Sequence, residues 1–180
     1  MNKLNTEYRS WFLIIMLVVI ATSLQAQSWN IGVGGATDKV LFGALSYQQS
    51  RHHYYVGVSY QFSNAKGDER VGPLSIIESD YGSPNSIGNK YYTVDLGYGY
   101  NIIDPVEVFI EASVGQKTYF ANYADPLYSG TPFHVVDHYK VVGGFGFGGN
   151  YLLNDWLALG ASYHTLRQLG IVIRFTFVHL

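Results

Sequence analysis

The stretch Tyr91-Tyr92-Thr93-Val94-Asp95-Leu96-Gly97-Tyr98-Gly99-Tyr100-Asn101-Ile102 alternates between two kinds of side chain. Every second residue is apolar or aromatic, from Tyr92 and Val94 through to Ile102. The residues between them are mostly small or polar and include Asp95. Successive side chains of a β-strand point to opposite faces. The period of two therefore predicts a strand with one apolar face and one glycine-rich polar face.

The same alternation recurs along the rest of the chain, and no stretch after Gln27 has a helical period. We predict eight strands of about 8–15 residues, long enough for tilted membrane strands, which need about 9–11. Tight turns are expected at Gln49–His52, Ile103–Pro105 and Asn154–Asp155, and longer loops at 64–88 and 121–137. The predicted strands cover about 29–36, 39–48, 53–63, 91–102, 106–119, 138–152, 156–165 and 169–177.

The composition agrees with strands in a membrane. Charged residues make up 13% of the 180 residues, aromatic residues 16%, and there are 20 Gly and 16 Tyr. An ordinary soluble domain has about 25% charged residues, so a soluble helical domain is disfavoured. The chain has no cysteine, which excludes disulfides and thiol chemistry. A net charge of −2 gives no sign of a nucleic-acid partner.

The charges within the predicted strands all fall on the glycine-rich face. A charged group that faces lipid at mid-depth costs about 2–4 kcal/mol. We therefore expect the apolar face to meet lipid and the charges to pair inside a closed barrel as a structural polar network. A soluble barrel with an apolar lumen, and an inner cavity at Gly144, Gly146 and Gly148, stay open as alternatives. The expected network consists of Asp95, Glu107, Glu111, Lys117, Lys140 and Arg174.

The first residues are expected to be an export signal. Trp11–Ala21 is an unbroken apolar run, too short to span a membrane as a helix and of the length of a signal-peptide core. We predict a signal peptide over 1–26 and a barrel domain over 27–180. Export places the tight turns in the periplasm and the loops at 64–88 and 121–137 outside the cell.

The last predicted strand carries the most specific resemblance. The run Gln168-Leu169-Gly170-Ile171-Val172-Ile173-Arg174-Phe175-Thr176-Phe177 is similar to the C-terminal strand signal of small eight-stranded outer-membrane barrels. Over the mature chain the sequence resembles the family of the OmpA transmembrane domain. The resemblance implies an all-β, eight-stranded antiparallel transmembrane barrel in the outer membrane of a Gram-negative cell envelope. It implies outer-membrane lipids and the barrel-assembly machinery as partners, and it implies no activity.

A few local motifs carry residue types that could do chemistry. Phe62-Ser63-Asn64-Ala65 resembles part of the motif of outer-membrane lipid A deacylases, but Gln61 stands where those enzymes have a histidine. A serine without its base is a weak nucleophile. His134 and His138 form a weak metal motif, and His52-His53 is interpreted as an interfacial pair in a turn. His164 faces inward with no serine or carboxylate placed beside it by the sequence.

We therefore predict no catalytic, cofactor-binding or metal-binding residue. The sequence favours a non-enzymatic outer-membrane protein that is structural or meets an extracellular protein or glycan through loops 64–88 and 121–137. Two alternatives stay open. One is a lipid-modifying enzyme similar to the lipid A deacylases, and the other is a barrel that binds or transports a small ligand.

Overall fold

The computed structural model describes residues 28–70, 74–124 and 131–179, so the export signal predicted over 1–26 lies outside the described residues. The described chain is almost entirely β-strand, with one short helix and one 3₁₀ turn. The elements are β1 (Ser28–Ala36), η1 (Thr37–Lys39), β2 (Val40–Gln49), β3 (His52–Gln61), β4 (Asp68–Arg70), α2 (Leu74–Tyr81), β5 (Ser86–Ile103), β6 (Val106–Ala124), β7 (Pro132–Asn154), β8 (Leu157–His164) and β9 (Gln168–His179).

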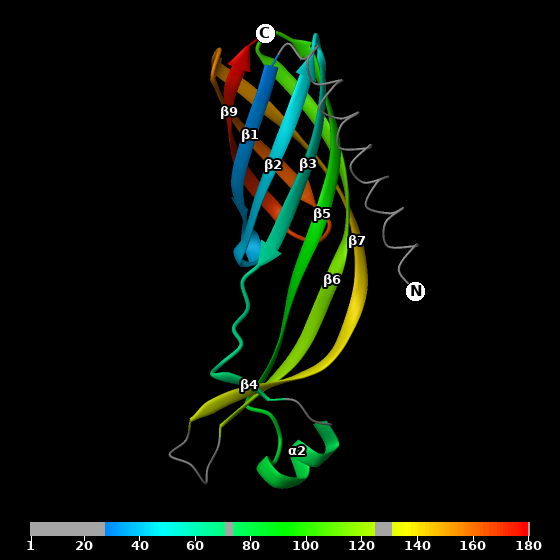
Figure 1. The fold of residues 1–180 in the computed structure, drawn as a ribbon, viewed down its shortest axis with the longest axis vertical. Helices are drawn as coiled ribbons and strands as arrows, with labels where there is room; N and C mark the ends of the chain where they lie inside the picture. Colours follow the sequence, from blue (N-terminus) through cyan, green and yellow to red (C-terminus); the bar gives the residue numbers. More distant parts are fainter. Residues whose placement is uncertain (1–27, 71–73, 125–130, 180) are drawn as a thin grey trace, which may run out of the picture.

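Eight of the nine strands of the described chain close into a ring, which confirms the predicted barrel (Figure 1). Neighbours in sequence pair antiparallel around the ring, and the pairing of β1 with β9 closes it. The tight turns predicted at one rim are present between β2 and β3, β5 and β6, and β7 and β8. The one described strand that is not part of the ring, β4, pairs in parallel with the outer end of β7.

The outer face of the ring is apolar. Residues at alternate positions, such as Val56, Leu96 and Ile110, are 48%, 62% and 64% exposed although they are large and hydrophobic. Aromatic side chains gather toward the turn-side rim, where Tyr54 lies 5.5 Å from Tyr98 and Trp156 lies 6.3 Å from Phe175, ring centre to ring centre. A closed barrel with an apolar exterior and aromatic belts is a transmembrane barrel of the outer-membrane type. The chain is therefore an integral membrane barrel with its tight turns on the periplasmic side.

A charge on this face should prevent stable insertion. Leu96 lies midway along the ring strands, opposite Val56 of β3 and Ala112 of β6. Leu96→Arg is expected to cost about 2–4 kcal/mol of folding free energy in a bilayer, because the guanidinium would face lipid. Urea titration in liposomes, scored by heat-modifiable gel mobility, measures the cost. Ile87→Arg, at a residue that is 77% exposed and lies beyond the ring, is the matched control and should change little. Equal stability of the two variants would contradict a lipid-facing Leu96.

Strands β5, β6 and β7 continue well beyond the ring on the extracellular side (Figure 1). The last pair that β3 makes with β5 is Tyr60 with Tyr92, and β8 ends where His164 meets Gly146 of β7. The prediction of irregular loops over 64–88 and 121–137 is therefore wrong in part. Residues 86–88, 121–124 and 132–137 are strand, and 64–88 also contains β4 and α2. We call the described residues of this part of the chain, 62–70, 74–91, 117–124 and 131–140, the extension.

The segment that connects β3 to β5 wraps around the tip of the extension. It first crosses one face of the sheet, where Asn122 Nδ2 donates to the carbonyl of Asn64 and Asn122 Oδ1 accepts the N–H of Lys66 at 2.9 Å. It then runs along the free edge as β4. It finally covers the opposite face as α2, whose Ile77 packs against Tyr123 and Phe133. Both faces of the tip are thus covered by the described residues of this segment, 62–70 and 74–85, which we call the wrap.

The alternation of apolar and polar residues in β7 is interrupted at one residue, and for this reason the sequence pattern does not predict the outer part of this strand. Tyr119 of β6 pairs with His138, but the next residue, Phe120, pairs with Val136. Asp137 is therefore an extra residue in β7, a β-bulge that shifts the side chains beyond it to the other face. A pattern of strict alternation ends at such a point, so the predicted strand starts at about 138 instead of at Pro132.

None of the helices among the described residues is long and apolar enough to cross a membrane.

Candidate functional site

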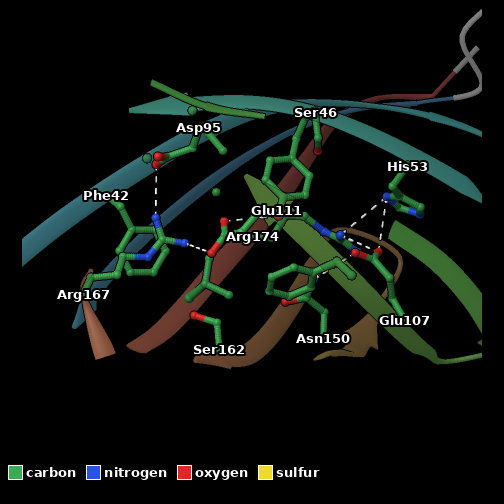
Figure 2. Close-up of a pocket in the computed structure, with 17 residues that line it drawn as sticks. Phe42, Ser46, His53, Asp95, Glu107, Glu111, Asn150, Ser162, Arg167 and Arg174 are labelled. Carbon is green, nitrogen blue, oxygen red and sulfur yellow. Dashed lines mark hydrogen bonds and ion pairs between the residues drawn. The ribbon is translucent and has the colours of Figure 1, made fainter. Parts of the chain in front are cut away.

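The lumen contains two clusters of buried charge (Figure 2). In the first cluster, Arg167 bridges two carboxylates. Its Nη1 lies 3.1 Å from Asp95 Oδ2, and its Nη2 donates to Glu111. All three side chains are almost completely buried, and the guanidinium carbon lies 4.3 Å from the centre of the Phe42 ring. The Tyr55 hydroxyl donates to Glu111 at 3.2 Å. Buried charges are tolerated when they are paired and hydrogen-bonded in this way.

The second cluster lies nearer the periplasmic turns and is centred on Glu107. Arg174 Nη1 lies 2.5 Å from Glu107 Oε2, and His53 Nδ1 lies 3.2 Å from the same oxygen. Asn150 Nδ2 donates to the other carboxylate oxygen at 3.0 Å. The two clusters together cross-link β3, β5, β6, β7, β9 and the turn between β8 and β9 through the lumen. Their arrangement fills the lumen with fixed ion pairs and leaves no wide channel in the part that the structure describes.

The structure brings together four of the six residues that the sequence assigns to the interior network: Asp95, Glu107, Glu111 and Arg174. It places Lys117 and Lys140 elsewhere, and among the described residues neither lysine pairs with any of those acids. The assignment of the two lysines to the network is therefore corrected. They lie on the predicted face of their strands, but beyond the end of the ring. Alternation predicts which face a residue is on and does not predict its position along the barrel axis.

Sequence reasoning misses the two other basic members of the clusters, Arg167 and His53. Arg167 lies in the tight turn before β9, where alternation makes no prediction, and the turn places its side chain over the lumen with 2% exposure. The interpretation of His53 as an interfacial turn residue is wrong. It is the second residue of β3, opposite Gly99 and Gln48, and is 1% exposed inside the barrel. Without the two lysines, the predicted network has three buried acids and only one base, Arg174. This imbalance of charge is the signal in the sequence that another buried base, here Arg167, is needed.

Inward glycines make room for large side chains of these clusters. A Cβ at Gly146 would overlap Glu111 and the His164 ring, and a Cβ at Gly148 would overlap the Phe109 ring. The space beside Gly144, Gly146 and Gly148 is therefore occupied, and the open wall that the sequence allows is not there. A cavity of about 60 Å³ remains between the clusters. A cavity needs roughly 10–15 Å³ to hold one water molecule, so this one has room for a few waters and not for a metabolite.

Gly97 tests how closely the lumen is packed. A Cβ at this position would overlap the Tyr55 ring, which also packs edge-on against Phe109 at 5.9 Å. Gly97→Ala is therefore expected to destabilise the barrel by about 1–3 kcal/mol, the usual cost of overpacking. Equilibrium unfolding in urea measures the effect. Gly43→Ala is a suitable control, because the nearest atom to a Cβ there is a carbonyl oxygen at 3.5 Å. A Gly97→Ala variant as stable as the control would contradict the packing.

A serine and a histidine are in contact near the extracellular end of the lumen, but their hydrogen bonds do not suit nucleophilic catalysis. His164 Nε2 lies 3.0 Å from Ser113 Oγ, and the N–H of Leu166 donates to His164 Nδ1 at 3.1 Å. Nδ1 therefore carries no proton, and the proton of the neutral ring sits on Nε2 and is donated to Ser113. A general base needs a free nitrogen facing the serine hydroxyl. The sequence does not predict this pair, because the two residues lie on strands that are not neighbours in the ring.

The other motifs do not form sites either. Ser63 accepts the N–H of Ala65 at 3.3 Å, in the turn that follows β3, as expected for the start of a loop. His134 lies near the carbonyl of Lys66, whereas His138 contacts Asp137. Among the described residues, no three His, Cys, Asp or Glu side chains gather in a group that would hold a metal ion.

Comparisons with known proteins do not establish a family for this chain. No protein-family model and no curated protein matches the sequence. Among solved structures, the chain is similar to the N-terminal β-barrel domain of Pseudomonas aeruginosa OprF, with a TM-score of 0.48 and 12% identity over 84% of this chain and 98% of that one. It is also similar to Neisserial surface protein A, with a TM-score of 0.45 and 12% identity over 83% and 95% of the two chains. The attachment invasion locus protein Ail of Yersinia pestis gives a TM-score of 0.43 and 13% identity over 83% and 90%. The fold assignment therefore stands on the closed ring and apolar exterior of the chain itself.

Proposed function

We propose that this outer-membrane barrel is a non-enzymatic protein that acts at the cell surface through its extension, by contact with an extracellular protein or glycan. The observation that carries the proposal is the organisation of the extension. It is a continuous sheet made of β4 and the outer ends of β5, β6 and β7, and together with α2 it has its own buried cluster of Ile77, Ala121, Tyr123, Phe133 and Val135. A chain that served only to span the membrane would need no more than short turns at this end.

The lumen supports the same proposal. Its two clusters pair the three buried carboxylates of the described chain, and the remaining cavity of about 60 Å³ is too small for a transported solute. The Ser113–His164 pair has the wrong proton arrangement for a nucleophile. Binding at the extension is therefore favoured over transport and over hydrolysis of a lipid.

A ring-only variant tests the proposal. Residues 61–91 and 118–139 are each replaced by an Asn-Gly turn, because Tyr60 pairs with Tyr92 and Lys117 pairs directly with Lys140. The variant and the full chain are placed in nanodiscs and applied to glycan arrays and to panels of extracellular proteins. We expect both to show heat-modifiable mobility and only the full chain to bind.

Four results would count against the proposal. Binding that is unchanged in the ring-only variant would remove the extension from the function. A change in lipid A mass that depends on the protein would assign the enzyme alternative. Ion conductance of the full chain in planar bilayers would assign the transport alternative. A full chain that binds nothing on either panel would also count against contact through the extension.

A further inference from the structure

The base of the extension carries two lysines that face each other. Lys117 of β6 lies directly opposite Lys140 of β7, and on its other side Lys117 is paired with Tyr91 of β5. This row is the first one beyond the last pair of β3 and β5, Tyr60 with Tyr92. The lysine pair therefore lies where the ring ends, on the face of the sheet that continues the lumen wall.

Among the residues that the structure describes, no carboxylate forms an ion pair with Lys117 or Lys140. Side chains two residues apart on one strand, and those opposite on adjacent strands, are the neighbours on a sheet face. Those of Lys117 include an aromatic ring, since its Nζ lies 5.4 Å from the centre of the Tyr119 ring, and Tyr119 stacks on His138 at 4.5 Å. Asp137 lines a pocket together with Asn89 and Tyr119, but its carboxylate contacts His138 Nδ1, at 2.7 Å, and not a lysine. The same-face neighbours of Lys117 are Asn89, Tyr91, Thr93, Gly115, Tyr119, His138, Lys140 and Val142.

Two like charges directly opposite on adjacent strands destabilise a sheet. The barrel does not relieve this repulsion with an acid from its described residues, although it supplies acids to both arginines of the lumen. Lys140 is exposed and Lys117 is half-buried, so an ion from solution or from the membrane surface can reach both. A bound anion would turn the repulsion into two attractive contacts.

We propose that Lys117 and Lys140 form an anion site that takes a phosphate group at the outer surface of the membrane. Phosphate suits two ammonium groups because it carries more than one charge and several acceptor oxygens. The position at the end of the ring is the level of lipid headgroups, and basic side chains close to an anionic membrane surface are attracted to it. The phosphate has two sources, a lipid headgroup or free inorganic phosphate, and the experiment separates them.

The chain offers a matched control in Lys90. It lies in the adjacent row of the extension, opposite Thr118, and points to the other face of the sheet from Lys117. Lys90→Gln changes the net charge as much as Lys117→Gln or Lys140→Gln does. It leaves the lysine pair intact.

The first experiment uses the full chain in nanodiscs of phosphatidylcholine doped with phosphatidic acid, whose headgroup is a phosphomonoester. Native mass spectrometry counts the phosphatidic acid retained on each barrel. The double variant Lys117→Gln/Lys140→Gln is expected to retain about thirtyfold less than the wild type, and Lys90→Gln is expected to retain as much as the wild type. Heat-modifiable gel mobility checks that all three proteins are folded.

The second experiment uses the full chain in nanodiscs of phosphatidylcholine alone. Inorganic phosphate is added at an ionic strength matched with chloride, and near-ultraviolet circular dichroism follows the thermal midpoint. We expect phosphate to raise the midpoint of the wild type and of Lys90→Gln, and not that of the double variant. Without phosphate and at low salt, Lys117→Gln should have a higher midpoint than the wild type, because one of the opposed charges is gone.

A response to phosphatidic acid alone supports the site with a lipid as the source, and a response to phosphate as well shows that the phosphate group suffices. Two results overturn the proposal. One is that neither experiment separates the double variant from the wild type. The other is that Lys90→Gln loses as much binding as the double variant, which would reduce the effect to general surface charge.

Discussion

Replacing Arg167 by Met is expected to destabilise the barrel by about 3–5 kcal/mol, the largest effect of any single change in the lumen. Arg167 is the cation that lies against both Asp95 and Glu111, and all three side chains are almost fully buried. Without it, two carboxylates remain in a lumen that offers little water to solvate them. Urea unfolding in liposomes, followed by heat-modifiable mobility, measures the loss.

The control for this variant is Arg51→Met, because Arg51 lies exposed in the turn between β2 and β3. A surface change of this kind is expected to stay within about 0.5 kcal/mol. A second variant separates charge from shape. In Arg167→Met/Asp95→Asn/Glu111→Gln the uncompensated charges are gone, so most of the lost stability should return. If the triple variant is no more stable than Arg167→Met, then lost packing, and not the unpaired carboxylates, causes the destabilisation.

Phe133→Ala is expected to open the tip of the extension while the ring stays folded. Phe133 is 1% exposed, its ring stacks on Tyr123 at 5.4 Å, and the Arg70 guanidinium carbon lies 3.9 Å from its centre. Truncation of a buried Phe costs about 3–5 kcal/mol, more than a small sheet with one covering helix can lose. The wrap should then detach, because β4 pairs with the same part of β7.

Limited trypsin digestion measures this opening. Cleavage after Lys66 and Arg70 should be at least about tenfold faster in Phe133→Ala than in the wild type, since each 1.4 kcal/mol raises the open population tenfold. The ring should keep its heat-modifiable mobility. Ile87→Ala, which removes a residue of the same extension that is 77% exposed, is the matched control and should be cut at the wild-type rate. Unchanged cleavage of Phe133→Ala, or loss of the ring together with the tip, would contradict a locally stabilised extension.

The ring can be predicted from the sequence because apolar residues alternate with small or polar residues along a strand that has one face in lipid and the other in the lumen. That rule places Asp95, Glu107, Glu111 and Arg174 on the inner face, and the structure has them in the lumen. The rule gives no height along the barrel axis. Lys117 lies on the same face of β6 as Glu111, but it is six residues further along the strand, beyond the extracellular end of the ring.

The remaining differences have local causes. Arg167 lies in a turn, and a turn has no alternation from which a face can be read. The bulge at Asp137 interrupts the pattern of β7, so the strand beyond it resembles a loop in the sequence. The faces of the tip are covered by the wrap, and this contact joins Asn64 to Asn122 across 58 residues. Polar contacts at such a separation leave no periodic signal in the sequence.

The path of the wrap sets an order in which the extracellular part can be completed. Residues 62–85 precede β5 in the chain, yet β4 has its partner in Phe133–Val135, and Asn64 has its partner in Asn122. Neither partner is in place until β6 and β7 have crossed the membrane and paired. The earlier segment can therefore reach its final place only after β6 and β7 have paired with each other. Ring closure depends on the pairing of β1 with β9, whereas completion of the tip depends on β6 and β7, so the two are separate events.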